Sequence, residues 1–571
     1  MCALEGNRTN LYSFDDYLFV RDHFDFYKDD GFFLALVKHY TKDEFEKIDK
    51  ELRELSEIVS LKWSPLANEA TKLENRVKCT IIQHYDAHNH RIDRISRCAE
   101  TETLEKGIFG LGLFDPDRNT PWSRFCKLFL LYELGEMGVM CPMVCTHGMV
   151  SLLEKYEELN KFNPEFMNIL RHLRNGATED GNGGYGIGAQ FISEIQGGSD
   201  VPSNLLEAVF DSDSNCWRLY GTKFFCSAMQ CDYALVSAKP KGTTSSTRIA
   251  IFAVPSWLPG NKEREIRNSY TIDRLKQKLG TAELPTAEVT YNGAVGYQVG
   301  PLENGLADIV GVVLSLSRLH IGIGSGAGGL RCVREANLYA QYRTAFGINL
   351  SLFPLMINQM NRLEHSAKRT AAAAFKIFAE FIELGERLAA GMKELTQIKD
   401  LTERKRRFRL RELIMLQKIV TCHDAPEQIR VAISFFGGHG IMEDFTPLPR
   451  FHRDTMIQEL WEGPRNVLLT QIHRDFQRAK DWYPPDQFVR DILIGGDSDI
   501  IEPLAGKFHR VMSHDSLLKN DAKTLAICQD WENISTILFH AYQDQALAEL
   551  NYQGKTLKLS RLLREFKKRE N

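Results

Sequence analysis

The feature that most constrains the fold of this chain is the order of its hydrophobic patterns: a strand-rich block lies between two long helical stretches. Residues 14 to about 175 carry apolar side chains at three- and four-residue spacing with few Pro or Gly, as amphipathic helices do. From about 186 to 300 there are short runs rich in β-branched and aromatic residues, bounded by Asp, Ser, Asn and Gly clusters, which predict strands joined by turns. Helical patterning returns at about 303 and continues to about 475.

This order predicts an α+β fold that is mostly α. Strands joined by turns, without intervening helices, favour an antiparallel sheet over a doubly wound one. We therefore expect four parts: an N-terminal helical domain (1–185), a central antiparallel β domain (186–302), a C-terminal helical bundle (303–475) and an extra helical tail (476–571).

Charge and cysteine content narrow the class of protein. The chain has 71 basic and 75 acidic residues, a net charge of −4, so nucleic-acid binding would require a local patch. Its 12 cysteines form no CxxC pair and no metal site is expected, which predicts reduced, mostly buried thiols in a cytoplasmic protein. No signal pattern opens the chain, and the most apolar stretch, Ile309 to Gly329, contains Arg318 and His320. We expect a buried helix there and no membrane span.

A glycine cluster at Gly324 to Gly329 matches the GxGxxG dinucleotide-binding pattern. That pattern needs a strand directly before it, but Ser315 to His320 continue a helical stretch. Small residues that allow close packing of helices are the favoured interpretation.

Four other segments carry groups suited to a flat or anionic ligand. Ser193 to Asp200 form a glycine turn that can approach a ligand closely, or a plain turn. Lys223 to Ser227 place aromatics and a hydroxyl on a strand, which could wall a ring or belong to the core. Arg343 and Phe346, three positions apart, would share one helix face. Gly437 to Gly440 end a helix and can present N–H groups to a pyrophosphate, or simply stop the helix.

One carboxylate, Glu462, stands between Trp461 and Gly463. An apolar wall disfavours the charged form of a carboxylate and raises its pKa, which makes a Glu a useful base near neutral pH. An ordinary surface Glu is the alternative.

In this order and spacing the segments resemble the motifs of the acyl-CoA dehydrogenase family. Ser193 to Asp200 are similar to its first signature, Lys223 to Ser227 to its K-x-W-I-T/S strand, and Arg343 to Gly347 to its R-x-x-F-G. Gly437 to Gly440 with Arg453-Asp454 resemble its second signature, and Trp461 to Gly463 its Tyr-Glu-Gly. The likeness covers about residues 100 to 470.

Finer details resemble the AidB-like branch, the alkylation-response flavoproteins. They are Met140-Cys141-Pro142, Gln196-Gly197-Gly198 and the Trp at position 461. That branch carries an extra C-terminal helical domain, which residues 476–571 would supply. Pro464 and Arg465 depart from the family, whose members usually have Thr or Ser at position 464.

The resemblance implies an oxidoreductase of fatty acid metabolism, a homotetramer with FAD at its subunit contacts. It would dehydrogenate an acyl-CoA at the α and β carbons and pass electrons to an electron-transferring flavoprotein. Glu462 would be the catalytic base, with hydride transfer to flavin N5. Cofactor-binding roles fall to Ser193, Gly198, Ser199, Phe225, Ser227, Arg343, Phe346, Gly437, Gly438, Trp461, Gly463 and Asn466. Ser199 and Arg318 would contact the substrate, Arg318 at its CoA moiety.

Two other functions stay open. An AidB-like flavoprotein with weak dehydrogenase activity could bind DNA through two groups of cations. The first is the basic run Arg404 to Arg411, and the second comprises Lys555, Lys558, Arg561, Arg564, Lys567, Lys568 and Arg569. Solvated helix faces or subunit contacts are the plainer interpretation of both. A fatty-acyl-binding protein without turnover is the other alternative.

Overall fold

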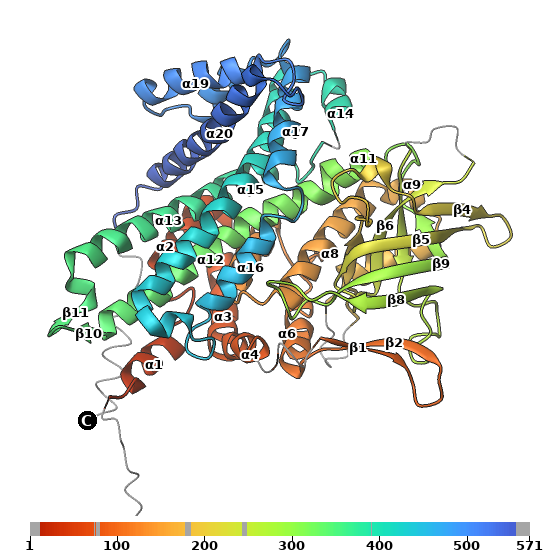
Figure 1. The fold of residues 1–571 in the computed structure, drawn as a ribbon, viewed down its shortest axis with the longest axis horizontal. Helices are drawn as coiled ribbons and strands as arrows, with labels where there is room; N and C mark the ends of the chain where they lie inside the picture. The colour runs from red at the N-terminus through yellow and green to blue at the C-terminus, as the bar shows by residue number, and fades with distance from the viewer. Residues whose placement is uncertain are drawn as a thin grey trace, which may run out of the picture.

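The computed structural model describes residues 12–72, 75, 80–176, 184–242, 248–389 and 391–554. Along the chain it forms a helical region, a β region, and a second helical region (Figure 1). The second helical region includes the C-terminal extension, which is the extra tail from residue 476 onward. The predicted α+β, mostly α, fold is confirmed. Figure 1 shows the β region at one end of the molecule and the long helices of the bundle extending away from it.

The N-terminal region is helical except for one hairpin. Its helices are α1 (Asp15–Asp22), α2 (Gly31–Thr41), α3 (Phe45–Ile58), α4 (Ser64–Ala70), α6 (Ala99–Phe109), α7 (Pro121–Tyr132), α8 (Met137–Lys155), α9 (Glu157–Asn160) and α10 (Pro164–Arg174). The hairpin pairs β1 (Ile81–Tyr85) with β2 (Arg91–Ser96), so the prediction of helix throughout this stretch is wrong there. Asp86 stabilises the turn by accepting from the His88 and His90 N–H groups, both at 2.8 Å.

The β region is one mixed sheet. Its strands are β3 (Gly188–Phe191), β4 (Glu207–Asp211), β5 (Cys216–Ser227), β6 (Tyr233–Pro240), β7 (Ala250–Pro255), β8 (Tyr270–Leu275) and β9 (Thr286–Gln298). Their order is β3-β6-β4-β5-β9-β7, with β8 on β9 and a further pairing of β6 with β7. Most neighbours are antiparallel as expected, but β6 runs parallel to both β3 and β4. The prediction of a purely antiparallel sheet is corrected on these two pairings.

The second helical region is built around one central helix. Its elements are α11 (Gly305–Asp308), α12 (Leu314–Tyr342), β10 (Thr344–Ala345), β11 (Ile348–Asn349), α13 (Pro354–Glu383), α14 (Met392–Gln397), α15 (Leu401–Phe436), α16 (Leu448–Gln458) and α17 (Arg465–Ala479). Most residues of α12 are buried, and α12 packs against both α13 and α15. The C-terminal extension continues with α18 (Pro485–Ile492), α19 (Ser498–Met512) and α20 (Ala522–Glu549), and α20 lies along α13 and α15 (Figure 1).

The glycine cluster of α12 serves packing. A Cβ added at Gly326 would lie 3.0 Å from the Ala371 Cα on α13, and one at Gly322 would overlap the Gln417 side chain on α15. These glycines let three long helices approach one another closely. The interpretation as packing rather than dinucleotide binding agrees with this arrangement.

Two helices, Met137–Lys155 and Gly305–Tyr342, are long and apolar enough to cross a membrane. The most apolar windows of these helices are 72% and 78% buried inside the protein. Core helices meet the same criteria of length and composition, so this observation is weak support for a membrane span. Ten cysteines lie in the described residues, all free and most of them buried.

Candidate active site

Glu462 lies in the tight turn between α16 and α17. Its backbone is left-handed, with φ of +59°, and Gly463 follows with φ of +99°. The left-handed conformation costs an L-residue other than Gly about 1 kcal/mol, so contacts from the rest of the fold must hold it. We call residues Glu459 to Gly463 the base loop.

Two buried cations hold the base loop by its carbonyl oxygens. Arg318 of α12 donates from Nε to the Glu462 oxygen at 2.9 Å. Lys418 of α15 donates from Nζ to the oxygens of Glu459 at 2.7 Å and Gly463 at 2.8 Å. Arg318 and Lys418 are 2% and 1% exposed. The structure therefore gives Arg318 a role in fixing the loop, and its burial does not support the predicted contact with a CoA moiety.

The Glu462 carboxyl group has a pKa near neutrality. Burial raises this pKa from 4.5 to about 7, and the charges of Arg318 and Lys418 partly oppose the rise. The carboxyl group lies near α8, where a hydrogen bond with Cys141 and burial raise the pKa of Cys145 and the Glu462 charge adds to the rise. At pH 7 the side chain is thus divided between an ionised and a protonated form, as suits a base.

The glycine turn after β3 is fastened to β5. The Ser193 oxygen accepts from the Phe224 N–H at 3.0 Å. Glu194, next in the chain, pairs with Lys223 at 2.8 Å, and both side chains are almost completely buried. A Cβ at Gly198 would lie 3.0 Å from Ser193 Oγ, so a glycine permits this close fold. Ser199, at the end of the turn, is exposed.

The aromatic segment of β5 presents a bare ring beside a hydroxyl group. Phe225 is 53% exposed, and Ser227 Oγ lies 2.9 Å from Thr286 Oγ1. The Lys276 ammonium lies 3.2 Å from the centroid of the Phe224 ring and 4.7 Å from that of Phe225. A planar ligand could lie on such a surface.

The turn between β8 and β9 connects this surface to the helix that carries the base loop. Lys278 donates to Thr286 Oγ1 at 2.9 Å, and the Thr281 N–H donates to Asp454 of α16 at 2.6 Å. Gly280 lies against α16 so closely that a Cβ there would be 2.5 Å from the Arg453 oxygen. Ser227 and Glu462 are therefore linked through a short series of contacts.

A second group of predicted residues lies at the far end of the bundle (Figure 1). Arg343 follows the last residue of α12, and Phe346 sits in the β10–β11 hairpin with φ of +52° and 96% exposure. The prediction that the two share a helix face is wrong, because α12 ends at Tyr342. Arg318 and Arg343 lie 25 positions apart, so roughly 35 Å of helix separates them.

Gly437 and Gly438 belong to this second group. Gly437 ends α15 with φ of +57°, and a Cβ at either glycine would meet no atom within 4 Å. A hydrogen bond of 2.8 Å between Tyr339 and His439 joins this turn to the end of α12. One chain thus brings Arg343, Phe346 and the two glycines to the same end of the bundle, away from Glu462.

The remaining predicted residues flank the base loop. Trp461 is partly buried against the core, and Asn466 is exposed on the first turn of α17. Three charged residues near the site had no predicted role: Glu194, Lys223 and Lys418. A Lys within the apolar stretch Leu413 to Cys422 was the available signal for Lys418, since an unpaired charge is rarely buried.

The basic run Arg404 to Arg411 is paired within the protein. Arg406 contacts Glu380 and Glu383, Arg409 contacts Asp491, and Arg411 contacts Asp475. Arg404 and Arg407 donate to backbone carbonyls, and Lys405 donates to Gln487. Because these side chains are already paired within the protein, few of the cations in the basic run are available to bind a phosphate backbone. The predicted tail cations, Lys555 to Arg569, lie outside the described residues.

Comparison with known proteins identifies the family. The model of the acyl-CoA dehydrogenase C-terminal domain matches residues 303–476, and that of the middle domain matches 189–294. "Acyl-CoA dehydrogenase family member 11" of Caenorhabditis elegans is 28% identical over 467 residues, covering 79% of this chain and 70% of that protein. The AidB protein of Escherichia coli (strain K12) is 27% identical over 412 residues, or 70% of each chain.

Solved structures share the fold. Bd2924 in its apo form superposes with a TM-score of 0.76 at 24% identity, over 91% of this chain and 97% of its own. C. elegans ACDH-11, in complex with C11-CoA, gives 0.73 at 22%, over 92% and 88%. A Bacillus anthracis acyl-CoA dehydrogenase complexed with FAD gives 0.59 at 15%, over 95% and 82%. These likenesses show the shared fold, and the two family models with the two relatives place the chain in the FAD-using acyl-CoA dehydrogenase family, as an AidB-like member.

Proposed function

We propose that this protein is an FAD-dependent acyl-CoA dehydrogenase in which Glu462 removes the α-proton of an acyl-CoA thioester. The observation that carries the proposal is the base loop itself. It holds a half-buried carboxyl group of pKa about 7 in a fixed position beside α8 and α12. Proton removal from a weakly acidic carbon requires such a positioned base.

The residues present fit FAD in two places. The bare Phe225 ring beside Ser227, together with Ser193, suits the face and edge of an isoalloxazine ring. The open glycine turn at Gly437 and Gly438 suits a phosphate chain, because no side chain fills the space in front of it. When bound, FAD supplies the acceptor for the hydride that leaves the β-carbon.

The chain's own groups can bind and orient the thioester. Among the described residues, nothing accepts a hydrogen bond from the Glu462 N–H group, so that group is free to donate to the thioester carbonyl oxygen. Because the N–H group and the carboxylate belong to the same residue, a thioester bound by its carbonyl oxygen would have its α-carbon close to the Glu462 carboxylate. Arg318 and Lys418 keep the loop from moving by holding three of its carbonyl oxygens.

Assembly and partners belong to the same proposal. The distance along α12 between Arg318 and Arg343 supports a cofactor site shared between subunits, as in a homotetramer. The family resemblance supports an electron-transferring flavoprotein as the oxidant, and the free, mostly buried thiols support a cytoplasmic location. The complex of C. elegans ACDH-11 with C11-CoA supports a fatty acyl-CoA as the substrate.

A visible spectrum of the purified protein tests the proposal. Adding acyl-CoAs of several lengths under anaerobic conditions should bleach the flavin absorbance with at least one of them. If none bleaches the flavin while acyl-CoA still binds, the dehydrogenase proposal fails and a fatty-acyl-binding role takes its place. If duplex DNA binds with salt-dependent affinity and no acyl-CoA bleaches the flavin, the DNA-binding alternative is favoured.

A further inference from the structure

Helix α20 of the C-terminal extension is hydrogen-bonded to α17, the helix that follows the base loop. Arg465 donates from Nη2 to the Glu532 oxygen and to Thr536 Oγ1, both at 3.0 Å. One turn further along α17, the Leu469 oxygen accepts from Trp531 Nε1 at 3.0 Å. Arg465 and Leu469 are four positions apart and lie on the same face of α17. The extension thus contacts α17 through two adjacent turns.

Arg465 stands three positions after Glu462, where the chain leaves the base loop. The left-handed conformations of Glu462 and Gly463 must be held by surrounding contacts. Arg318 and Lys418 hold the loop from α12 and α15, and both act on the side before Pro464. Arg465 holds the other side, and Pro464 restricts the backbone between them to φ of −63°.

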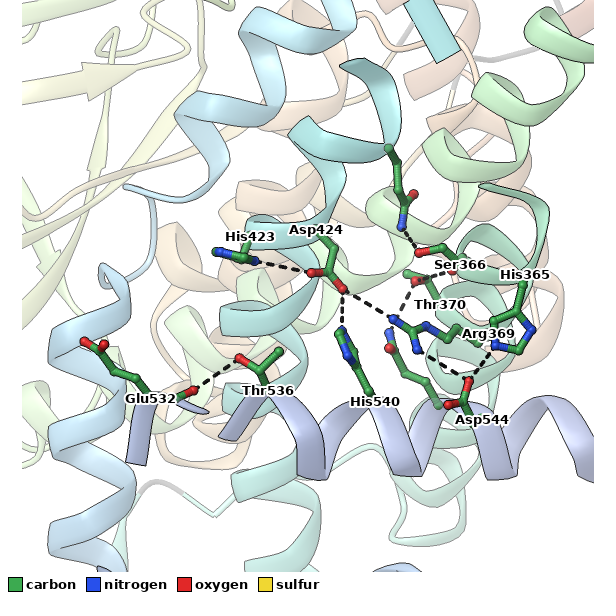
Figure 2. Close-up of polar contacts among 12 residues, drawn as sticks. His365, Ser366, Arg369, Thr370, His423, Asp424, Glu532, Thr536, His540 and Asp544 are labelled. Carbon is green, nitrogen blue, oxygen red and sulfur yellow. Dashed lines mark hydrogen bonds and ion pairs between the residues drawn. The ribbon is translucent and has the colours of Figure 1, made fainter. Parts of the chain in front are cut away.

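A separate set of contacts fixes α20 to the bundle (Figure 2). Asp424 of α15 accepts from His540 at 2.7 Å, and Asp544 accepts from His365 of α13 at 2.9 Å. Arg369 lies 3.5 Å from Asp544. Figure 2 shows His540 and Asp544 on the same helix as Glu532 and Thr536, pointing toward Asp424 of α15 and toward His365 and Arg369 of α13. α20 is therefore anchored independently of Arg465.

We propose that Arg465 is a positioning residue that ties the base loop to α20, so that the C-terminal extension belongs to the architecture of the active site. Both hydrogen bonds come from Nη2, and arginine suits the role because the planar guanidinium fixes the directions of the two N–H groups on that atom, whereas a lysine ammonium rotates freely. The effect on catalysis rests on the proposed function of Glu462. The effect on the structure of the loop does not.

Hydrogen–deuterium exchange tests the structural part in the full-length holoprotein. In Arg465→Ala, the amides of residues 460–468 should exchange about tenfold faster, because two hydrogen bonds from a charged group are lost. In Arg465→Lys the exchange rate of these amides should lie between that of Arg465→Ala and that of the unaltered protein. In Thr536→Val the exchange rate should rise less than in Arg465→Ala. Lys376→Gln is the matched control, since its partner Glu549 lies at the far end of α20. Unchanged exchange in Arg465→Ala would overturn the proposal.

The kinetic part uses flavin reduction by a substrate acyl-CoA. Arg465→Ala should lower kcat by about tenfold with KM nearly unchanged, because binding is kept and alignment is lost. Arg465→Lys should recover part of the rate, and Lys376→Gln should match the unaltered protein. Equal losses in Arg465→Ala and Lys376→Gln would count against a specific role. A protein whose flavin no acyl-CoA reduces would refute the proposed function, while the exchange result would still decide the role of Arg465.

Discussion

The cations around Glu462 contact its backbone rather than its carboxylate. Arg318 and Lys418 donate to carbonyl oxygens of the base loop, and no ion pair to the Glu462 side chain occurs among the described residues. A direct ion pair would keep the carboxylate charged and weakly basic. Holding the loop by its carbonyls instead fixes the position of the side chain while burial keeps its pKa at about 7.

The rate of flavin reduction should therefore depend on pH through Glu462. Below the pKa of about 7 the carboxyl group is protonated and cannot accept the α-proton, so the rate should rise with pH through a midpoint near 7. Stopped-flow measurement of flavin bleaching across pH 5 to 9 checks this.

Arg318→Gln serves as the comparison for that profile. The Arg318 charge opposes the rise in the pKa of Glu462, so its removal should move the midpoint to higher pH. A midpoint near the ordinary value of a Glu, in either protein, would contradict the account.

Single residues could be given a predicted role where a motif carried them. The role of Glu462 as the base is such a prediction, made from its place between an indole and a glycine and from the family motif. Lys418 was not, because it lies 44 positions earlier in the chain, on another helix, and only the fold brings it to the loop. The burial of Lys223 against Glu194 likewise depends on the contact between two loops that local sequence does not encode.

At the scale of elements, α12 shows how glycine determines helix packing. Gly326 faces the backbone of α13, whereas a Cβ at Gly328 would meet no atom within 4 Å. Glycine is therefore required for helix packing at Gly326 but not at Gly328, two positions later. At Gly326 a larger side chain must push two helices apart, while at Gly328 it would only restrict the unfolded chain.

Substitutions at these two positions should change stability in opposite directions. Gly326→Val should lower the free energy of unfolding by about 2 kcal/mol or more, because the added atoms overlap the α13 backbone. Gly328→Ala should raise it by up to about 1 kcal/mol through helix propensity. Denaturant unfolding of both variants measures the difference, and equal effects would show that α12 is not packed as described.

Several elements could not be predicted from the sequence. The β1–β2 and β10–β11 hairpins are short and lie within helical surroundings, so their patterns gave no separate signal. The parallel pairing of β6 with β3 and β4 depends on long-range register, which strand composition does not reveal. The long helices and the order of the three regions were predictable because their periodicity extends over many residues.

At the scale of the whole molecule, the predicted cofactor residues divide into two groups at opposite ends of the bundle. Ser193, Phe225 and Ser227 lie on the side of Glu462, and Arg343 and Phe346 lie beyond the far end of α12. We therefore propose that a cofactor using both groups takes them from two chains. The sequence implied such sharing only through the family resemblance, since the separation depends on α12 being one uninterrupted helix.

Mixing two inactive variants tests this division. Glu462→Gln and Arg343→Ala should each be inactive or weak alone, but mixed oligomers should regain up to about a quarter of the full rate, because some sites then contain both intact groups. The activity of co-expressed, doubly tagged oligomers is the measurement. No recovery in confirmed mixed oligomers would show that each chain completes its own site.

The most direct test of the central claim is flavin bleaching in Glu462→Gln, with Glu462→Asp as its matched control. Gln keeps the size of the side chain but cannot accept the proton, so we expect bound FAD and bound acyl-CoA with reduction slowed by about 10³-fold or more. Glu462→Asp keeps a carboxylate at a shorter reach and should be slowed less. Bleaching of Glu462→Gln at the rate of the unaltered protein would contradict the account.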